Sequence, residues 1–458
     1  MRRFVLAIGI AMIARMAFAE ATFDELPADV KTKIDIRLAR TSDEIAASPF
    51  ATLSSFEVHG PAEDAGVIEC ARRLGVKHFV MHNIHGSLKD PDDARLNAWL
   101  DRCEAAKIEV RCILHSTDLE LWRAALKNYG RRIKHFAYLN EPNQPTNNDH
   151  TKPHWMPEKY VDELRRMKAV RDEIAPDVKL GGPELAMLMA MEEKPFPWLR
   201  RAIESGLLGL IDEFTFHPYR QGYSPRNVPE NPSTFEARPG QGYATYEEQI
   251  GVLRQRVGAK PLIINEVGWS TTPRGPICEH TQAKFALRQQ IMDFSLSIEC
   301  AVYFLLRERH VDRPFPLWHL ENHFGIAYPD NSPKPAYAAL QALYSQLDSA
   351  CRRVADAPVN WSAPGVKWHL FEDASRPVPA LKLFYWLPVP AQDDFKPVRA
   401  EARLMGVRVE NLPVSDAPRC LRLHKIGDRW GWPVVIDMVA YETDTKVKWK
   451  SDPAPPSR

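Results

Sequence analysis

The chain has 458 residues, of which 45% are hydrophobic, 26% charged and 10% aromatic. This balance is that of a folded globular protein, and it excludes a disordered chain, a collagen-like chain and a polytopic membrane protein. Lysine and arginine number 60 against 59 aspartate and glutamate residues, so the formal net charge is +1. Without an excess of basic charge the chain has no electrostatic field for nucleic acid, and we expect no such partner.

The first nineteen residues have the pattern of a targeting segment. Arg2 and Arg3 precede an apolar run over 4–14, and small residues flank Phe18 at the end of the segment. The run is too short to cross a bilayer of roughly 30 Å as a helix. The pattern predicts a signal peptide over 1–19 and export to the periplasm or the extracellular medium, without membrane contact after cleavage. An uncleaved anchor is the alternative, which Arg15 disfavours because it interrupts the apolar stretch.

From about residue 50 to 347, short β-branched runs alternate with segments of helical periodicity, which is typical of repeated βα units. The predicted strands are 50–58, 77–82, 108–115, 133–140, 178–185, 211–217, 261–266 and 300–306. Helical segments between them include 62–74, 93–106, 157–174, 243–257 and 281–297. Eight strands with intervening helices predict an α/β fold, the (β/α)8 TIM barrel. A doubly wound sheet is disfavoured because no glycine-rich phosphate-binding turn follows the first strand.

After a last helix that begins at Pro335, the hydrophobic periodicity changes to two. The runs 366–371, 380–386, 398–404, 420–424 and 433–441 are predicted strands, separated by Pro, Asp and Gly turns. We therefore divide the chain into a signal peptide (1–19), a catalytic barrel (20–348) and a small all-β, sandwich-like domain (349–458). The proline-rich tail over 451–458 is expected to fray.

Seven cysteines are spread along the chain without a Cys-x-x-Cys pair or a histidine at metal-binding spacing. We therefore expect no zinc site. In an oxidising compartment Cys351 and Cys420 are the most natural disulfide pair. Burial of the cysteines as small apolar side chains is the alternative.

Two glutamates follow apolar strands at the positions where TIM barrels carry their chemistry. Glu141 follows the fourth strand and Glu266 the seventh. These strands lie across the barrel from one another, so both carboxylates can converge on one bond, as in glycoside hydrolysis. A single glutamate at a strand end is more often a helix cap or a solvated loop residue, but the pair favours catalysis.

The motifs resemble those of the clan-A retaining glycoside hydrolases, and in particular of families 39, 5 and 30. That clan has an Asn-Glu pair at the end of strand four, which Asn140-Glu141-Pro142 matches. Its nucleophilic glutamate ends strand seven, where this chain has Glu266-Val267-Gly268-Trp269. Phe216-His217-Pro218-Tyr219 is similar to the His-x-Tyr element of the clan. The three motifs occur in the strand order of the clan over about 300 residues.

The resemblance implies a role for each matched residue. Glu141 would be the general acid/base and Glu266 the nucleophile, while Asn140 would donate to the sugar 2-hydroxyl. Tyr219 would keep Glu266 ionised. These roles require a pKa of Glu141 that is raised by its surroundings and a pKa of Glu266 that is held low by hydrogen-bond donors.

The sequence departs from the clan pattern at two strand ends. The clan usually has an arginine after strand two, where this chain has Met81-His82-Asn83. It often has a tryptophan after strand eight, where this chain has Leu306-Arg307-Glu308. Arg307 can replace one of these functions or pair with Glu308. The subfamily and the substrate are therefore left open.

Further residues at the strand ends are candidates for substrate binding. Trp155 and Trp269 offer flat rings for stacking on a pyranose, with core packing as the alternative. The loop 220–245, which contains Tyr223 and Phe235, is expected to form one wall of the cleft because it exceeds an ordinary barrel connection. Contacts to sugar hydroxyls, with local capping as the alternative, are expected from His59, His82, Asn83 and His115. His217 is a candidate for contact with substrate, and a structural hydrogen bond is its alternative role.

We therefore expect an exported retaining glycoside hydrolase that cleaves a β-linked, or geometrically equivalent α-L, glycosidic bond by double displacement. Its partner would be an oligosaccharide or polysaccharide, and no metal or organic cofactor would be needed. A catalytically silent carbohydrate-binding or scaffold barrel is the alternative, although it has no need of two repelling carboxylates. A metal-dependent barrel hydrolase would want a His-x-His pair on strand one, which offers only His59.

Overall fold

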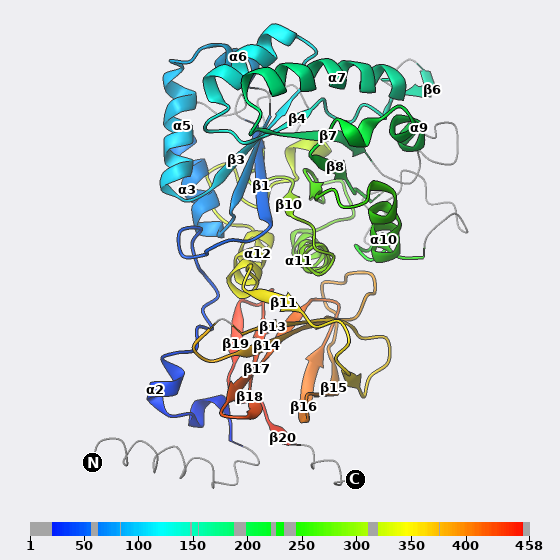
Figure 1. Ribbon diagram of the computed structural model, residues 1–458. Coiled ribbons are helices and arrows are strands. Elements are labelled where there is room, and N and C mark those ends of the chain that lie inside the picture. The colour runs from blue at the N-terminus through cyan, green and yellow to red at the C-terminus, as the bar shows by residue number, and fades with distance from the viewer. Residues whose placement is uncertain are drawn as a thin grey trace.

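The computed structural model describes residues 21–55, 63–82, 84–146, 149–153, 155–186, 198–220, 226–232, 244–309, 319–374 and 376–451. A parallel barrel covered by helices stands on a smaller antiparallel β domain (Figure 1). The predicted signal peptide and nearly all of the proline-rich tail lie outside the described residues. Within the described part of the chain, no helix has both the length and the apolar character that a membrane span requires.

Eight parallel strands close the barrel, and each corresponds to one predicted run. They are β1 (Phe50–Ser55), β2 (His78–His82), β3 (Glu109–Leu114), β4 (His135–Tyr138), β7 (Lys179–Ala186), β8 (Glu213–His217), β9 (Leu262–Ile264) and β10 (Cys300–Tyr303). The barrel closes where Phe50 of β1 pairs with Ala301 of β10. Apolar side chains such as Val80, Ile113 and Ile263 fill its interior. The predicted TIM barrel is confirmed.

Helices cover the outside of the barrel, and the five helical segments named from the sequence are all present. They are α3 (Asp64–Leu74), α5 (Ala94–Ala105), α7 (Pro157–Ile174), α10 (Tyr246–Val257) and α11 (Glu279–Ser295). Further helices are α2 (Ala28–Lys31), α4 (His85–Lys89), α6 (Leu119–Tyr129), α9 (Trp198–Glu204) and α12 (Pro335–Gln346). Their first turns follow ordinary capping rules: Asp93 accepts from the Leu96 amide in α5, and proline opens α7 and α12.

The β domain consists of two antiparallel sheets, as a sandwich-like fold requires. The larger contains β11 (Cys351–Arg353), β13 (Lys367–Asp373), β14 (Ala380–Trp386), β17 (Arg419–Ile426), β18 (Arg429–Asp437) and β19 (Glu442–Asp444). The smaller contains β12 (Asn360–Trp361), β15 (Val398–Leu404), β16 (Val407–Val414) and β20 (Trp449–Ser451). The five predicted runs correspond to β13, β14, β15, β17 and β18. The sequence did not predict β16, which contains a proline, a residue that usually argues against a strand.

Helix α11 lies between the barrel strands and the β domain (Figure 1), and for this reason nearly all of its side chains are buried. The Arg288 guanidinium donates to the carbonyl oxygens of Leu387 and Val389 at 3.1 and 2.9 Å. The rings of Phe294 and Phe371 meet edge to face at 5.2 Å. The indole of Trp386 donates to Glu230 at 2.5 Å. Polar and aromatic contacts thus brace one side of the barrel against the β domain.

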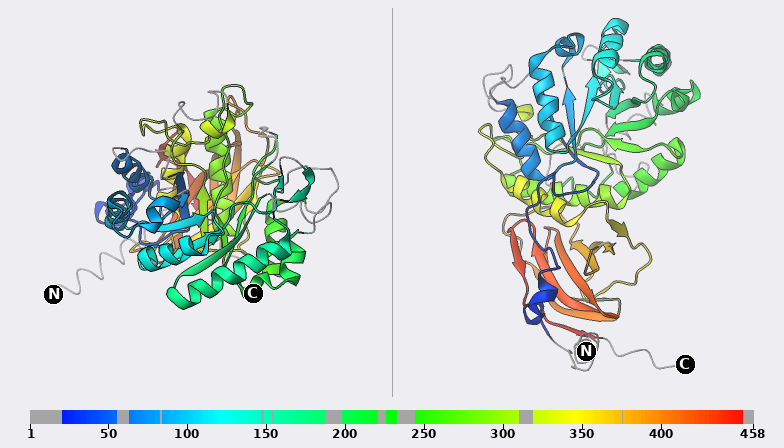
Figure 2. Two further views of the ribbon diagram at one scale, coloured as in Figure 1. Left: turned by 90° about the horizontal axis from the view of Figure 1, so that it is seen from above. Right: turned by 60° about the vertical axis from the view of Figure 1, so that its left-hand side comes forward.

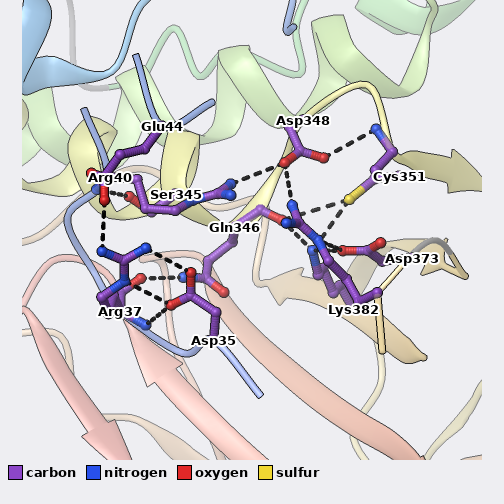
Figure 3. Close-up of polar contacts among 12 residues, drawn as sticks. Asp35, Arg37, Arg40, Glu44, Ser345, Gln346, Asp348, Cys351, Asp373 and Lys382 are labelled. Atoms are coloured by element: carbon purple, nitrogen blue, oxygen red, sulfur yellow. Dashed lines mark hydrogen bonds and ion pairs between the residues drawn. The ribbon is translucent and has the colours of Figure 1, made fainter. Parts of the chain in front are cut away.

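A second group of buried charges joins the end of α12 to the β domain (Figure 3). Arg40 contacts the Asp348 carboxylate at 3.0 Å, and the Lys382 ammonium contacts Asp373 at 2.8 Å. Lys382 also lies 3.3 Å from the Cys351 sulfur. The acidic and thiol groups of this cluster are close enough for a metal ion. Because the cations of Arg40 and Lys382 already bind the carboxylates, we interpret the cluster as an ion-pair network that joins the domains.

All seven cysteines are free thiols, so the predicted pair of Cys351 and Cys420 is not formed. Six of them are buried, and Cys278 is half-buried. Burial raises the pKa of the Cys70 thiol to about 11. The structure agrees with the alternative interpretation, in which most cysteines are small buried side chains.

The chain crosses the β domain before it enters the barrel. The segment 21–36, drawn in blue, runs beside the strands of the β domain (Figure 2, right). The Trp449 indole donates to the Ala21 carbonyl at 2.6 Å, and the Phe23 ring lies 5.5 Å from that of His424. Arg422 donates to the Asp35 carbonyl at 2.6 Å. The first described residues are therefore packed against the last strands of the chain.

Candidate active site

The two glutamates that the sequence singled out lie together at the mouth of the barrel. Glu141 follows β4, and Glu266 follows β9. One carboxylate oxygen of each residue lies within 4.8 Å of the other and of a ring nitrogen of His217. Glu266 is buried, and Glu141 is half-buried. Two carboxylates and an imidazole are therefore close enough together to act on one bond of a bound substrate.

The turn after β9 is shaped by close backbone packing. The Phe304 amide donates to the Val267 carbonyl at 2.9 Å. A Cβ atom on Gly268 would lie 1.9 Å from the Phe304 carbonyl oxygen, a distance that no side chain can adopt. Glycine at this position thus allows the segment that carries Glu266 to lie against the end of β10.

His217, the last residue of β8, is fully buried and lies between carboxylates on both sides of its ring. Its Nδ1 lies 2.9 Å from Glu141 Oε1, and its Nε2 lies 2.8 Å from Glu184 Oε2. The nearer oxygen of Glu266 is 3.8 Å from Nδ1. Burial by itself lowers the pKa of His217, but the surrounding carboxylates outweigh it and raise that pKa well above its ordinary value.

Glu184 is a third carboxylate of the site, and the sequence analysis did not single it out. It lies near the end of β7 and is fully buried. Its Oε1 accepts from the Asn265 amide at 2.6 Å, and its backbone amide donates to the Thr215 hydroxyl at 2.9 Å. The signal for it was weak, because Glu184 lies inside the predicted strand 178–185 and follows Gly-Gly-Pro, whereas Glu141 and Glu266 stand at the ends of apolar runs.

Glu266 is held from two sides. The Tyr219 hydroxyl donates to its Oε2 at 3.0 Å, and His82 Nε2 lies 3.4 Å from its Oε1. Burial raises the pKa of Glu266 to about 8, and repulsion from Glu141 acts in the same direction, while His217 and Tyr219 lower it. The expected donors are present, but burial acts against them. Desolvation outweighs the donors.

His82 stands where the clan carries an arginine. Burial, together with the positive charges nearby, lowers the pKa of His82 well below its usual value, so its imidazole is neutral at neutral pH. His82 Nε2 approaches Glu266 without forming a hydrogen bond among the described residues, and a neutral ring supplies no counter-charge. The His115 ring lies 5.1 Å from that of His82. Both histidines thus reach the site, whereas Asn83 and His59 lie outside the described residues.

Glu141 sits on backbone of unusual conformation. Its φ is +46°, and Leu139 and Glu184 also have φ near +55°. Such values are uncommon outside glycine and cluster at functional sites. The amide of Gln144 donates to Glu141 Oε2. Beside it, the side-chain oxygen of Asn140 is buried and has no hydrogen-bond partner among the described residues.

Two aromatic candidates have different surroundings. Trp269 is only 1% exposed and packs against Phe285 in the core, so the expectation that it stacks on a sugar is wrong. Its backbone carbonyl accepts from Gln282 at 2.8 Å. Trp155 is half-buried beside the turn after β4, where its amide donates to the Pro142 carbonyl at 2.9 Å. The Lys159 ammonium lies 4.8 Å from its ring, and its role toward substrate stays a prediction.

Arg307 is structural. It is buried and donates to Glu63 at 2.7 Å and to the Pro329 carbonyl at 3.1 Å, while Glu308 pairs with Lys334. Arg309 is close enough to His82 for its positive charge to lower the pKa of that histidine. Arg309 also lies 3.6 Å from Glu321, whose pKa is raised by burial.

The expected cleft wall is described in part. Tyr223 and Phe235 lie outside the described residues. Within 226–232, Glu230 accepts from Trp386 of the β domain. The preceding Arg220 is buried, with its guanidinium 4.4 Å from the Tyr246 ring. The described part of this loop thus packs at the domain junction.

Glu141, His217 and Glu266 are also close enough to hold a metal ion. A metal would have to displace the hydrogen bond between His217 Nδ1 and Glu141. It would compete as well with the Tyr219 hydroxyl at Glu266. Because each of these atoms already has a hydrogen-bond partner, we interpret the group as acid/base machinery.

Solved structures share this fold. A family 39 glycoside hydrolase from Bacteroides cellulosilyticus WH2 matches with a TM-score of 0.60 and 16% identity, over 82% of this chain and 81% of that one. The GH39 enzyme from Xanthomonas axonopodis pv. citri matches with a TM-score of 0.52 and 16% identity, over 80% and 78% of the two chains. A family 30 subfamily 8 xylanase from Clostridium acetobutylicum matches with a TM-score of 0.50 and 12% identity, over 90% and 96%.

At these identities the likeness shows a common fold, which is the fold that the resemblance in the sequence implied. No protein-family model matches the sequence, and no curated protein matches it.

Proposed function

We propose that the protein is an exported retaining glycoside hydrolase, with Glu141 as general acid/base and Glu266 as nucleophile. The observation that carries this proposal is the approach of the two carboxylates, whose oxygens come within 4.8 Å. Retaining enzymes have carboxyl groups about 5 to 5.5 Å apart, whereas inverting enzymes leave about 6.5 to 9.5 Å for a water molecule. An oxygen-to-oxygen approach within 4.8 Å is compatible with the retaining separation, and on this basis we propose double displacement.

In the first step a carboxylate oxygen of Glu266 attacks the anomeric carbon, and the bond from that carbon to the leaving oxygen breaks. Glu141 transfers its proton to the leaving oxygen. The hydrogen bond from His217 occupies Glu141 Oε1, so the transferable proton resides on Oε2. The side-chain amide of Gln144 donates to Oε2 when Glu141 is ionised. After rotation of that amide by 180°, its oxygen can accept from Oε2 when Glu141 is protonated.

In the second step Glu141, now ionised, accepts a proton from water as the water oxygen attacks the anomeric carbon. The bond to Glu266 breaks, and its carboxylate is released with net retention of configuration. The hydroxyl of Tyr219, 3.0 Å from Glu266, stabilises the released charge. Both carboxylates then have their starting protonation states.

For the substrate we propose a β-linked, or equivalent α-L, oligosaccharide or polysaccharide. This follows the motif resemblance, and the shared fold with enzymes named as family 39 and family 30 hydrolases supports it. Export rests on the pattern of residues 1–19. No metal or organic cofactor enters the proposed steps.

The test compares the wild type with Glu141→Ala and Glu266→Ala on a panel of aryl glycosides and oligosaccharides. Glu266→Ala should be inactive on every substrate. Glu141→Ala should retain activity on substrates with good leaving groups, because an activated phenol departs without protonation, and azide should restore its rate as a glycosyl azide of retained configuration. Full activity of either variant on an oligosaccharide would refute the assignment.

The alternative, a silent carbohydrate-binding barrel, gives a different result in the same experiment. It would bind sugars in the wild type and in both variants without turnover of any aryl glycoside. Turnover that depends on Glu266 excludes it.

A further inference from the structure

Glu184 is buried more completely than either catalytic carboxylate, so its negative charge needs a partner in the protein interior. Its two oxygens accept hydrogen bonds from Asn265 and His217. An ionised carboxylate in a dry interior requires a counter-charge, and an amide supplies none. Among the described residues, His217 is the hydrogen-bonded neighbour of Glu184 that can carry a positive charge, and the charge of Arg111 acts on Glu184 without a hydrogen bond.

The geometry at His217 limits its protonation state. Each ring nitrogen lies within 3 Å of a carboxylate oxygen, Nδ1 at Glu141 and Nε2 at Glu184. A neutral imidazole has one N–H donor and one lone pair, so one of these contacts would then place a lone pair against a carboxylate oxygen. Only the imidazolium satisfies both contacts when both carboxylates are ionised.

We propose that Glu184 is a positioning residue that keeps His217 doubly protonated, so that His217 provides the positive charge of the catalytic pair. This charge takes the place of the arginine that the clan carries after strand two, where this chain has the neutral His82. Among the described residues, the titratable side chains that face the His217 ring are His82 of β2, Glu141 after β4, Glu184 of β7, Tyr219 after β8 and Glu266 after β9.

The imidazolium has two consequences for the proposed reaction, on which this inference rests. Its Nδ1–H fixes Glu141 Oε1 as an acceptor in both steps, which prevents the catalytic proton from moving to the ring. Its charge also lies 3.8 Å from Glu266 and favours the ionised nucleophile. Glu184 touches neither the substrate nor the reacting atoms, and it acts through His217 alone.

The test replaces Glu184 by glutamine, which keeps the shape and removes the charge. Asp293→Asn is the matched control, because Asp293 is also a fully buried carboxylate, bonded to Tyr246 at 2.9 Å on helix α11. Burial raises the pKa of Asp293 to about 7, so at pH 7 the control removes a carboxyl that is about half ionised.

The first readout does not depend on activity. In protein labelled with ¹⁵N-histidine, the ring nitrogens of His217, identified by loss of the signal in His217→Asn, are followed by NMR against pH. We expect an imidazolium at pH 7 in the wild type and in Asp293→Asn, and a neutral ring at pH 7 in Glu184→Gln. A neutral ring in the wild type, or an imidazolium retained in Glu184→Gln, would overturn the inference.

The second readout is the pH profile of kcat/KM on an aryl glycoside. Loss of the positive charge on His217 should raise the pKa values of both catalytic carboxyl groups. The acidic and basic limbs of the profile should therefore move to higher pH in Glu184→Gln, by at least about one unit. A merely structural role would lower the rate equally at every pH and leave the limbs in place, and that result would contradict the inference. If the wild type hydrolyses no glycoside while His217 titrates as expected, the proposed function fails and the charge assignment stands.

Discussion

Replacement of Tyr219 by phenylalanine gives a sharp test of the nucleophile, because it removes one atom from the site. The Tyr219 hydroxyl donates to Glu266 Oε2 at 3.0 Å, and both residues are buried. The ring of Tyr219 packs edge to face on Phe304 and Phe324, contacts that phenylalanine retains. The variant therefore changes the electrostatics of Glu266 with little change in packing.

The size of the effect follows from the hydrogen bond. A hydrogen bond to a charged group contributes about 1.5 to 3 kcal/mol. Each pKa unit corresponds to about 1.36 kcal/mol, so loss of the bond should raise the pKa of Glu266 by about one to two units. The nucleophile must be ionised, and the acidic limb of kcat/KM should therefore move to higher pH by the same amount. Well below that limb the variant should be about 10- to 100-fold slower, and it should approach the wild type above it.

The assay is the pH profile of aryl glycoside hydrolysis for the wild type, Tyr219→Phe and a control. Tyr160→Phe serves as the control, because the buried Tyr160 hydroxyl donates to the neutral Tyr138 carbonyl at 3.1 Å. This control should lose about 0.5 to 1.5 kcal/mol of stability and leave the limbs in place. A Tyr219→Phe profile that is lowered equally at all pH values would refute the role of Tyr219.

Three further predictions concern the pH range, the domain junction and metals. The catalytic carboxylates titrate as a pair, and burial and mutual repulsion hold the last proton of that pair to higher pH than an ordinary carboxyl would hold it; kcat/KM for substrates with poor leaving groups should therefore fall only in the neutral to basic range, and a fall centred near pH 5 would contradict this. Asp348→Ala leaves the buried Arg40 unpaired and should cost about 3 to 5 kcal/mol of stability, seen as a lowered Tm, with kcat at 25 °C nearly unchanged; an unaltered Tm would show that the network does not stabilise the junction. Dialysis against a chelator should leave hydrolysis unchanged, and loss of activity with recovery on addition of a divalent metal would favour a metal-dependent site at Glu141, His217 and Glu266.

Much of the site was predictable because barrel topology turns a local pattern into a spatial one. The carboxyl ends of parallel strands meet at one rim, so a polar residue after an apolar run is placed by its strand number alone. Glu141, His217, Tyr219 and Glu266 all follow this rule, and the structure brings them together. Glu184 follows it as well, but its place in a Gly-Gly-Pro-Glu stretch resembles a strand interior and hid it.

Other features depend on contacts between distant segments, which no local pattern reports. Trp269 is buried because helix α11 brings Phe285 against its ring. Arg307 turns away from the site because Glu63, far away in sequence, lies within reach. The raised pKa of Glu266 likewise reflects burial by the whole barrel mouth, whereas the motif alone suggested only its donors.

The central claim, double displacement at Glu141 and Glu266, is tested most directly by the stereochemistry of the wild-type reaction. Proton NMR of an aryl glycoside digest, recorded before mutarotation, gives the configuration of the sugar first released. Two displacements at the anomeric carbon predict a product with the configuration of the substrate. A first product of opposite configuration would mean a single displacement by water, and it would contradict the assignment of Glu266 as the nucleophile.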